Sequence, residues 1–556
     1  MIVQAAIEAS AVGFRSRAGE VLVHDVSLSV GHGELVAITG GGPGRAALLD
    51  VLSGLRRPTS GAVNRPGGRA ARGRPVAGYV PAADTLPPVL PLAGALRYTA
   101  AVRGGPGAAD DALSLAGLTA RAAAPASALD AGERKRAAVA AELLCKPEQL
   151  FLDAPTAGLD PAQASEVLSL LRRLADGGVT ALLTTSSPLD VARCDKVAVL
   201  AAGGHLVFFG TPEAARGYFG ADSLEEIYQR LAGVGDPAAA WSRRFFQFVH
   251  TRVGFTPVPT AASAAGPAVL LPDAAGPHSA GPVSVLADLG TVPDPDELAD
   301  LDELADLEEV ADSGEAGDPG GTAGDGPAAR LVAATRAVRQ LPALVSRNVE
   351  VMRRWAVART VLAAAPAAVL LAFALLIGAG AFDAPRAGLA WAVLGGFCIG
   401  LAYGLPQVSS ELGMLRAERF GGLSAVGYVL AKLAVLVPVL AAADAVALVV
   451  PAAFGRVPPG YGPAYLTVLL SSAVALALAL LLSAAALARP LRAAPGQAVL
   501  LLALLPAAAL LTLLDHPAWP DWLVLGALAL ALAAAVTVLI ARRVPPGPGG
   551  RAAARF

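Results

Sequence analysis

The chain has 556 residues, a formal net charge of -2 and 55% hydrophobic residues. This length predicts more than one domain, and this hydrophobic content is typical of a membrane protein. The balanced charge, without a basic stripe interleaved with aromatic residues, argues against a nucleic-acid-binding surface. Most ionisable residues precede Arg359, so we expect a soluble front and a membrane-embedded back.

The N-terminus, MIVQAAIEASAV, lacks a basic segment followed by a long apolar core, so we expect no cleaved signal peptide. Cys145, Cys194 and Cys398 lie far apart and without metal-ligand spacing. We interpret all three as buried thiols and predict neither a zinc site nor a disulfide framework.

Residues 1–235 alternate short apolar strands with helical stretches, which predicts a parallel α/β domain. The strands are expected at residues 34–39, 76–80, 149–153, 180–185 and 196–201. The first strand leads into TGGGPGRAA, residues 39–47, and then into an apolar helix. Backbone N–H groups of such a loop, together with the helix N-terminus, cradle phosphates.

A second landmark is LDAGERKRAAVAAELLCKPEQLFLDAPTAGLD, residues 129–160. We expect a helix capped by Asp130, with Glu133 completing a capping box, and then a buried strand that ends in Asp153. A carboxylate at the carboxyl end of an apolar strand is where an α/β sheet places Mg²⁺ beside a nucleotide.

These segments resemble the Walker A loop, signature helix and Walker B strand of ATP-binding-cassette (ABC) transporters, most closely the G-type (White) branch and its actinobacterial relatives. Four further segments match that family in order: GYVPAADTLPPVLPLAGALRYTA at 78–100, AGLD at 157–160, ALLTTSSP at 181–188 and VFFGTPEAARGYFG at 207–220. The resemblance covers residues 15–220. It implies a P-loop NTPase-like nucleotide-binding domain over residues 1–235 that uses ATP and Mg²⁺.

The same comparison shows where the Walker A loop departs from the family pattern. Aligned on Gly44, the leading Gly is Thr39, the Lys is Arg45 and the Mg²⁺-binding hydroxyl is Ala46; if Gly40 leads instead, the loop is one residue short. Pro43 also removes one N–H donor. The degenerate nucleotide-binding set is Thr39, Gly40, Gly41, Gly42, Gly44, Arg45, Ala46, Ala47 and Asp153.

Three further catalytic positions are replaced: Ala82 stands at the Q-loop Gln, Ala154 at the Walker B Glu, and Ser186 at the H-loop His. Hydrolysis requires a Lys and Mg²⁺ to neutralise the phosphoryl group and a polar group to orient water. Losing one such group commonly costs about a hundredfold to a thousandfold in rate. We therefore expect weak nucleotide binding, a weak Mg²⁺ site at Asp153 and negligible ATP hydrolysis by this chain.

The signature loop is also altered. It comprises Asp130, Ala131, Gly132 and Glu133, and it is followed at a distance by the D-loop residue Asp160. In the family, Ser at the position of Asp130 faces the γ-phosphate bound by the partner subunit. A carboxylate there would repel that phosphate, even while it caps its own helix.

Residues 236–329 are acidic and rich in Pro, Ala and Gly, which predicts a disordered linker. Residues 330–359 then form a basic amphipathic pattern that resembles the elbow helix of the G-type family. We expect this helix to lie at the cytoplasmic membrane surface, anchored by Trp355 and by arginines that include Arg347, Arg353 and Arg354.

Six apolar segments follow, each close to the length that crosses about 30 Å of hydrocarbon. They lie at residues 360–382, 388–407, 428–454, 465–488, 495–514 and 522–540. We predict an all-α six-span domain of the ABC-2 type over residues 360–545 and a tail at 546–556. Arginines concentrate in the inner loops and the tail, which predicts cytoplasmic termini by the positive-inside rule.

The inner segment at residues 411–432 resembles the family's coupling helix. Our coupling candidates are Glu411, Arg416, Glu418 and Arg419; the alternative is that these are ordinary juxtamembrane charges. Asp444 is an acid inside a predicted span, where it faces either a cavity or a neighbouring helix.

The sequence therefore predicts an ABC half-transporter in a bacterial cytoplasmic membrane, in contact with membrane lipids. It would export a hydrophobic or lipid-like substrate as a homodimer or as a heterodimer with a homologous half-transporter. The alternative is a catalytically silent membrane scaffold or regulatory partner of an active ABC transporter.

Overall fold

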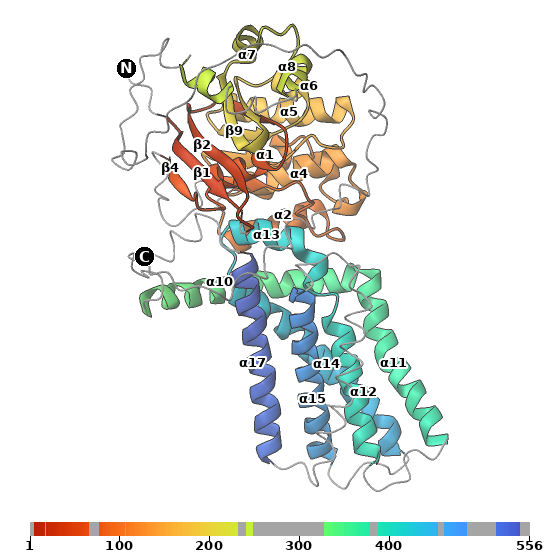
Figure 1. Cartoon of the computed structure of the whole chain (residues 1–556). Helices are drawn as coiled ribbons and strands as arrows, with labels where there is room; N and C mark the ends of the chain where they lie inside the picture. Colours follow the sequence, from red (N-terminus) through yellow and green to blue (C-terminus); the bar gives the residue numbers. More distant parts are fainter. Residues whose placement is uncertain are drawn as a thin grey trace, which may run out of the picture.

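The computed structural model describes residues 5–16, 18–65, 77–105, 107–231, 241–247, 327–378, 387–453, 461–485 and 519–544. Figure 1 shows an α/β domain lying above a bundle of long helices. One helix, α10, runs across the top of the bundle and lies between the two parts. Most of the predicted linker, residues 248–326, and the predicted span at 495–514 lie outside the described residues.

The α/β domain is built on a nine-stranded sheet with the order β4-β1-β2-β9-β8-β3-β7-β6-β5. Its strands are β1 Ile7–Arg15, β2 Val21–Val30, β3 Leu35–Gly40, β4 Ser60–Asn64, β5 Ala77–Val80, β6 Gln149–Leu152, β7 Thr180–Thr184, β8 Lys196–Ala201 and β9 His205–Gly210. The five predicted strands, β3 and β5 to β8, pair in parallel. The sequence analysis did not predict β1, β2, β4 or β9, which extend the sheet through mainly antiparallel pairs.

Helices cover both faces of the parallel strands, and this explains why every residue of β5, β6 and β7 is buried. The helices of this domain are α1 Gly44–Ser53, α2 Leu92–Arg103, α3 Ala109–Leu115, α4 Ala131–Leu143, α5 Pro161–Asp176, α6 Pro188–Val191, α7 Pro212–Phe219 and α8 Leu224–Leu231. Cys145 and Cys194 lie in this core as buried thiols, as predicted.

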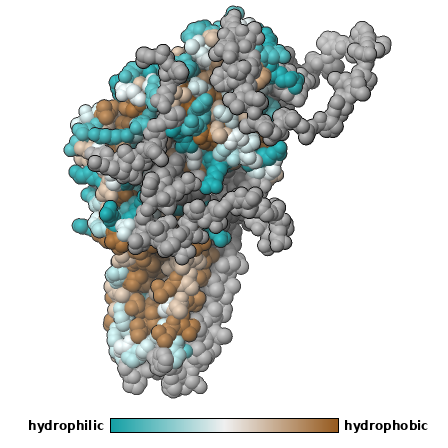
Figure 2. All heavy atoms as spheres, turned by 90° about the vertical axis from the view of Figure 1, so that its left-hand side faces the viewer, coloured by the Kyte–Doolittle hydropathy of each residue, from teal (hydrophilic) through white to brown (hydrophobic). Residues whose placement is uncertain are grey.

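The helical part comprises α10 Pro327–Arg354, α11 Ala356–Gly378, α12 Ala387–Gly404, α13 Leu412–Phe420, α14 Ala425–Ala453, α15 Tyr461–Ala485 and α17 Trp519–Arg543. Among the described residues, five helices are long and apolar enough to cross a membrane: α11, α12, α14, α15 and α17. Figure 2 shows the corresponding contrast, with hydrophobic side chains gathered on the helical part and hydrophilic ones on the α/β domain.

A repeat of small residues lets α12 and α15 approach closely. Gly396, Gly400 and Gly404 recur every fourth residue on α12. A Cβ atom at Gly400 would lie 2.3 Å from the Ser472 carbonyl oxygen of α15. Small residues at this spacing allow helix backbones to contact one another inside a membrane, where burial from water does not drive association.

The predicted elbow helix is present, but it ends at Arg354, and residues 356–359 belong to α11. Arg353 and Arg354 are exposed, whereas Arg347 is 2% exposed and forms an ion pair with Glu418 of α13. The prediction that Arg347 anchors the helix at the membrane surface is therefore wrong, because this face of α10 packs against α13.

Cys398 also departs from the prediction. It is exposed on α12, whereas we had interpreted it as a buried thiol. An apolar span gives no sequence signal of which face packs against its neighbours, because all of its faces are hydrophobic.

The Arg347–Glu418 pair generates a stability prediction. Removing one partner of a buried ion pair leaves the other charge uncompensated, at a cost of about 3–5 kcal/mol. We expect Arg347→Ala to lower the free energy of unfolding in detergent by that amount, as measured by chemical denaturation. The double variant Arg347→Met with Glu418→Leu should recover most of the loss. The matched control is Arg353→Ala on the exposed face of α10; equal effects of Arg347→Ala and Arg353→Ala would contradict the prediction.

Candidate functional site

The candidate nucleotide site lies where four adjacent parallel strands end. The order β3-β7-β6-β5 places the ends of these strands side by side. Each strand leads to a predicted position: Gly40 ends β3, Ser186 follows β7, Asp153 follows β6, and Ala82 follows β5. The fold therefore brings these residues of distant sequence to one edge of the sheet.

The glycine-rich loop connects β3 to α1 through three exposed residues, Gly41, Gly42 and Pro43. Gly40 has a φ of 125°, and a Cβ atom there would lie 1.8 Å from the Leu200 carbonyl oxygen, so this position requires glycine. The helix begins at Gly44 without a side-chain cap, and Arg45 is half-buried in its first turn. An uncapped helix N-terminus preceded by an exposed glycine loop fits a phosphate group.

Asp153 is oriented by Thr184, a residue that the sequence analysis did not single out. The Thr184 hydroxyl donates to Asp153 Oδ1 at 2.8 Å, and the Ala154 N–H donates to Thr184 Oγ1 at 2.8 Å. Ala154 has a φ of 42°, in the left-handed region. The position next to Asp153 therefore has a fixed backbone, but its methyl side chain cannot orient a water molecule.

The predicted Q-loop and H-loop positions lie at the same edge of the sheet. Ala82 and Ser186 are exposed, and the Ala82 carbonyl accepts a hydrogen bond from Lys135 Nζ on α4. Burial lowers the pKa of Lys135, while Asp84 and Asp153 oppose that shift. Ala46 supplies no oxygen for a metal, and the described residues contain no cluster of three His, Cys, Asp or Glu side chains. Asp153 is therefore the residue at this edge that would hold Mg²⁺, and the glycine-rich loop with the α1 N-terminus is the part that would hold a phosphate.

The signature and D-loop residues lie at two neighbouring helix N-termini. Asp130 and Glu133 form the predicted capping box of α4, with bonds of 2.7 and 3.0 Å, and Ala131 is the first residue of that helix. Asp160 caps α5 by accepting from the Gln163 N–H at 2.8 Å. A Cβ atom at Gly132 would lie 2.9 Å from the Gln163 Cβ, so the two loops are in contact.

Tyr228 of α8 contacts the start of the glycine-rich loop. Its hydroxyl lies 2.5 Å from Thr39 Oγ1, and Thr39 is 1% exposed. A buried hydroxyl requires a partner, so Thr39 in place of glycine is matched by Tyr228. The family's sequence motifs gave no signal for Tyr228, because it lies almost 190 residues further along the chain.

Asp50 forms a buried polar cluster beneath the loop. Its carboxylate lies 3.0 Å from Arg56 Nε and accepts the Tyr79 hydroxyl at 3.0 Å. Burial raises the pKa of Asp50 to about 6, and Asp153 adds to this increase, while Arg56 and Tyr79 oppose it. The signal in the sequence was a single acid within the apolar helix that follows the loop.

The membrane-side helix α13 packs beneath this cluster (Figure 1). The Phe420 and Tyr79 rings lie 5.3 Å apart, and Arg103 Nη2 of α2 donates to the Ala417 carbonyl at 3.1 Å. A Cβ atom at Gly413 would lie 2.5 Å from the Asp84 carbonyl oxygen. The segment after β5 therefore rests directly on α13.

The four coupling candidates have different surroundings. Arg416 is exposed and lies within electrostatic reach of Asp50 and Tyr79. Glu418 pairs with Arg347 of α10, and Arg419 donates to the Val544 carbonyl at 2.9 Å. Arg416 is thus directed to the α/β domain, whereas Glu418 and Arg419 connect helices of the membrane-side part.

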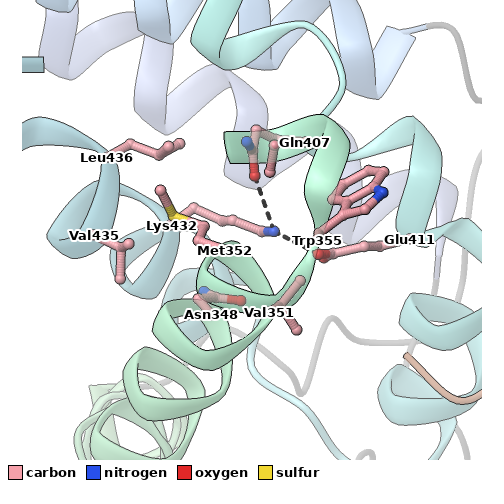
Figure 3. A pocket seen from close by; sticks show the side chains of 10 residues that line it. Asn348, Val351, Met352, Trp355, Gln407, Glu411, Lys432, Val435 and Leu436 are labelled. Atoms are coloured by element: carbon pink, nitrogen blue, oxygen red, sulfur yellow. Dashed lines mark hydrogen bonds and ion pairs between the residues drawn. The ribbon is translucent and has the colours of Figure 1, made fainter. Parts of the chain in front are cut away.

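Glu411 belongs to a small pocket between α10, α14 and the segment that follows α12 (Figure 3). Lys432 points between two acceptors in this pocket, with its Nζ 2.6 Å from Glu411 and 3.2 Å from Gln407. The Tyr428 hydroxyl also donates to Glu411, at 2.8 Å. These bonds position the end of α12 against α14.

Asp444 is fully buried on α14, and its Oδ2 lies 2.5 Å from Ser472 Oγ on α15. Of the two surroundings that the sequence left open, the described residues show packing against neighbouring helices.

The family model described as ABC transporter matches residues 23–157, which include the glycine-rich loop, α4 and Asp153. An ABC transporter ATP-binding/permease protein of Mycobacterium tuberculosis is 34% identical over 43% of this chain and 28% of its own length. Residues 23–157 belong to the ABC transporter family.

Other ABC relatives match a smaller share of the chain. ABC transporter G family member 15 of Dictyostelium discoideum is 32% identical over 34% of this chain and 14% of its own length. Nod factor export ATP-binding protein I of Ralstonia nicotianae is 35% identical over 35% of this chain and 64% of its own length. These matches span less than two thirds of each relative. An ABC nucleotide-binding domain followed by membrane-length helices fits a G-type half-transporter.

The buried carboxyl of Asp50 generates a pH prediction. Because its pKa in the folded chain lies near 6, above the ordinary value of 3.8, its contribution to stability is present below about pH 4 and is lost as the pH rises through 6. We expect Asp50→Asn to gain stability over the wild type across this window, by at most about 3 kcal/mol. Denaturant unfolding between pH 4 and 8 measures the difference. An exposed control, Asp110→Asn, should show no such trend; parallel curves for wild type and Asp50→Asn would refute the assignment.

The contact at Gly413 generates a second prediction. A side chain there must displace the Asp84 backbone, and overpacking of this kind costs about 1–3 kcal/mol. We expect Gly413→Val to raise hydrogen exchange around residues 82–84 by roughly tenfold to a hundredfold. Gly526→Val on α17, where nothing lies within 4 Å of the added Cβ, is the control. Unchanged exchange in Gly413→Val would show that α13 does not support this segment.

Proposed function

We propose that this chain is an ABC half-transporter subunit that contributes export across a bacterial cytoplasmic membrane, with weak nucleotide binding and negligible ATP hydrolysis of its own. The observation that carries the proposal is the packing of α13 and α10 against the nucleotide-binding domain beside substituted catalytic positions. The domain is built to transmit movement to the membrane helices, but its side chains are not those that cleave ATP.

The contacts between the two parts support transmission of movement. Tyr98 of α2 donates to Glu350 of α10 at 2.7 Å, and Gln340 of α10 donates to the Val102 carbonyl at 2.8 Å. A third bond joins Arg103 of α2 to the Ala417 carbonyl of α13. The three bonds therefore connect α2 to two membrane-side helices. A rotation of α2 with the nucleotide-binding domain would therefore move α10 and α13 together.

The substituted positions support weak binding and slow chemistry. Arg45 retains a positive charge, but its planar guanidinium differs in shape and reach from the ammonium of lysine. Ala46, Ala82, Ala154 and Ser186 replace the groups that position Mg²⁺ and water in the family. Because catalysis of phosphoryl transfer depends on positioning and charge neutralisation, the loss of all four leaves little rate enhancement.

A second subunit completes the proposed transporter. Half-transporters of this family generally work as dimers, and each nucleotide lies between the Walker motifs of one subunit and the signature loop of the other. Asp130 would present a carboxylate to the partner's γ-phosphate, so a homologous partner with an intact Walker site would still meet a poor signature loop from this chain.

The orientation and substrate are part of the same proposal. The nucleotide-binding domain would lie in the cytoplasm, which places Arg416, Arg419 and Arg542 on the cytoplasmic side, in agreement with the positive-inside rule. The apolar helices suit a hydrophobic or lipid-like substrate. Export is also the activity in the printed name of the Ralstonia relative.

A second candidate is a catalytically silent scaffold or regulatory partner of an active ABC transporter. Two contacts favour it: the Tyr228 and Thr39 hydroxyls form a hydrogen bond, and Lys135 Nζ donates a hydrogen bond to the Ala82 carbonyl. In each case, a side chain of this chain forms a hydrogen bond with a group beside the sheet edge where a phosphate would bind. A neighbouring gene that encodes a homologue with intact motifs favours the transporting heterodimer over the scaffold.

ATP hydrolysis tests the proposal directly. We expect the purified chain in lipid nanodiscs to hydrolyse Mg-ATP no faster than its Asp153→Asn variant, because Asp153 has no catalytic partners. The positive control restores the family residues through Arg45→Lys, Ala46→Ser, Ala82→Gln, Asp130→Ser, Ala154→Glu and Ser186→His. Vigorous wild-type activity that Asp153→Asn abolishes would overturn the proposal.

A further inference from the structure

Asp444 and Ser472 form an isolated polar pair in the membrane-side bundle. Both side chains are fully buried, on α14 and α15 respectively. Among the described residues, Asp444 Oδ1 has no hydrogen-bond partner, and it faces Gly396 of α12, where an added Cβ would lie 3.1 Å away. Three helices therefore meet around one carboxyl group.

The hydrogen-bond geometry of Ser472 favours one position for a proton. Ser472 Oγ lies 2.5 Å from Asp444 Oδ2 and 3.0 Å from the Leu469 carbonyl oxygen. A serine hydroxyl has one proton to donate, whereas an ionised carboxylate and a carbonyl are both acceptors. Both contacts are satisfied when Asp444 Oδ2 carries a proton and donates it to Ser472, while Ser472 donates to Leu469.

The charges around Asp444 agree with this arrangement. Among the described residues, Tyr403 of α12 and Tyr465 of α15 are the titratable groups whose charges reach Asp444, and neither is cationic. No described Lys or Arg forms an ion pair with it. An unpaired carboxylate in hydrocarbon is costly, and burial without a cation favours the neutral acid.

We propose that Asp444 and Ser472 form a proton-binding site in the membrane domain, in which Asp444 is neutral when α12, α14 and α15 are packed together. The ligand of this site is a proton rather than a metal or a substrate. The site does not depend on the nucleotide-binding domain, so its test is separate from that of ATP-driven export.

Opening of the bundle would release the proton. When water reaches Asp444, the carboxylic acid O–H bond breaks, the proton passes to water, and both bonding electrons remain on Oδ2. Ser472 then turns its hydroxyl from the Leu469 carbonyl to the carboxylate. Closure requires the reverse transfer, so separation of α12 from α14 and α15 is linked to proton release.

Infrared difference spectroscopy tests the site. The full chain is reconstituted in lipid bilayers at neutral pH, and the spectrum of Asp444→Asn is subtracted from that of the wild type. We expect the difference to contain the C=O stretch of a protonated carboxylic acid, which the variant loses. A lost carboxylate band in its place would show that Asp444 is ionised and would overturn the proposal.

Serine variants separate the site from its surroundings. Ser472→Ala removes the acceptor of the Asp444 proton and should shift the acid band to higher frequency. Ser471→Ala changes the neighbouring buried residue of α15 and should leave the band in place. If Asp444→Asn fails to fold, the comparison of wild type with Ser472→Ala remains decisive, because identical spectra would contradict the proposed bond.

Discussion

Arg103 connects the nucleotide-binding domain to the membrane helices. Its Nη1 lies 2.8 Å from Glu142 of α4, and its Nη2 donates to the Ala417 carbonyl of α13 at 3.1 Å. The two charged side chains are 2% and 5% exposed. Because two buried charges are tolerated only when each is well satisfied, the relative positions of α2, α4 and α13 depend on one another. Glu142 also accepts the Tyr79 N–H at 3.3 Å, which brings β5 into the same interaction.

The retained contacts and the substituted residues lie in different places. Arg103, Glu142 and Tyr79 form part of the surface on which α13 packs, and Phe420 of α13 lies against Tyr79. The substituted residues lie instead at the edge of the sheet where phosphate and metal would bind. Transmission of movement requires packing and hydrogen bonds, whereas phosphoryl transfer requires specific charged and polar groups. The contacts with α13 therefore depend on residues other than those at the predicted phosphate edge.

The membrane-side helices are positioned by polar pairs and by close backbone approach. Lipid tails are as apolar as leucine side chains, so hydrophobic burial gives little preference for one helix arrangement over another. Glu411 with Lys432, Arg347 with Glu418, and Asp444 with Ser472 each connect specific neighbours. The glycines of α12 add the close contact with α15. Uniformly apolar helices thus acquire defined neighbours through a few polar or very small residues.

The sequence by itself determined the parallel strands, the capped helix at Asp130, five of the membrane-length segments and the residue types at the predicted catalytic positions. These follow from local hydrophobic pattern, local capping chemistry and residue identity, which need no knowledge of distant contacts. The antiparallel strands, the Thr184 contact with Asp153, the Tyr228 contact with Thr39 and the burial of Arg347 were decided by the tertiary structure. Each of these depends on a partner that is distant in sequence, and a charged residue in an amphipathic helix gives no sign that another helix will cover it. The protonation inferred for Asp444 likewise depends on two acceptors meeting at Ser472, which only helix packing brings together.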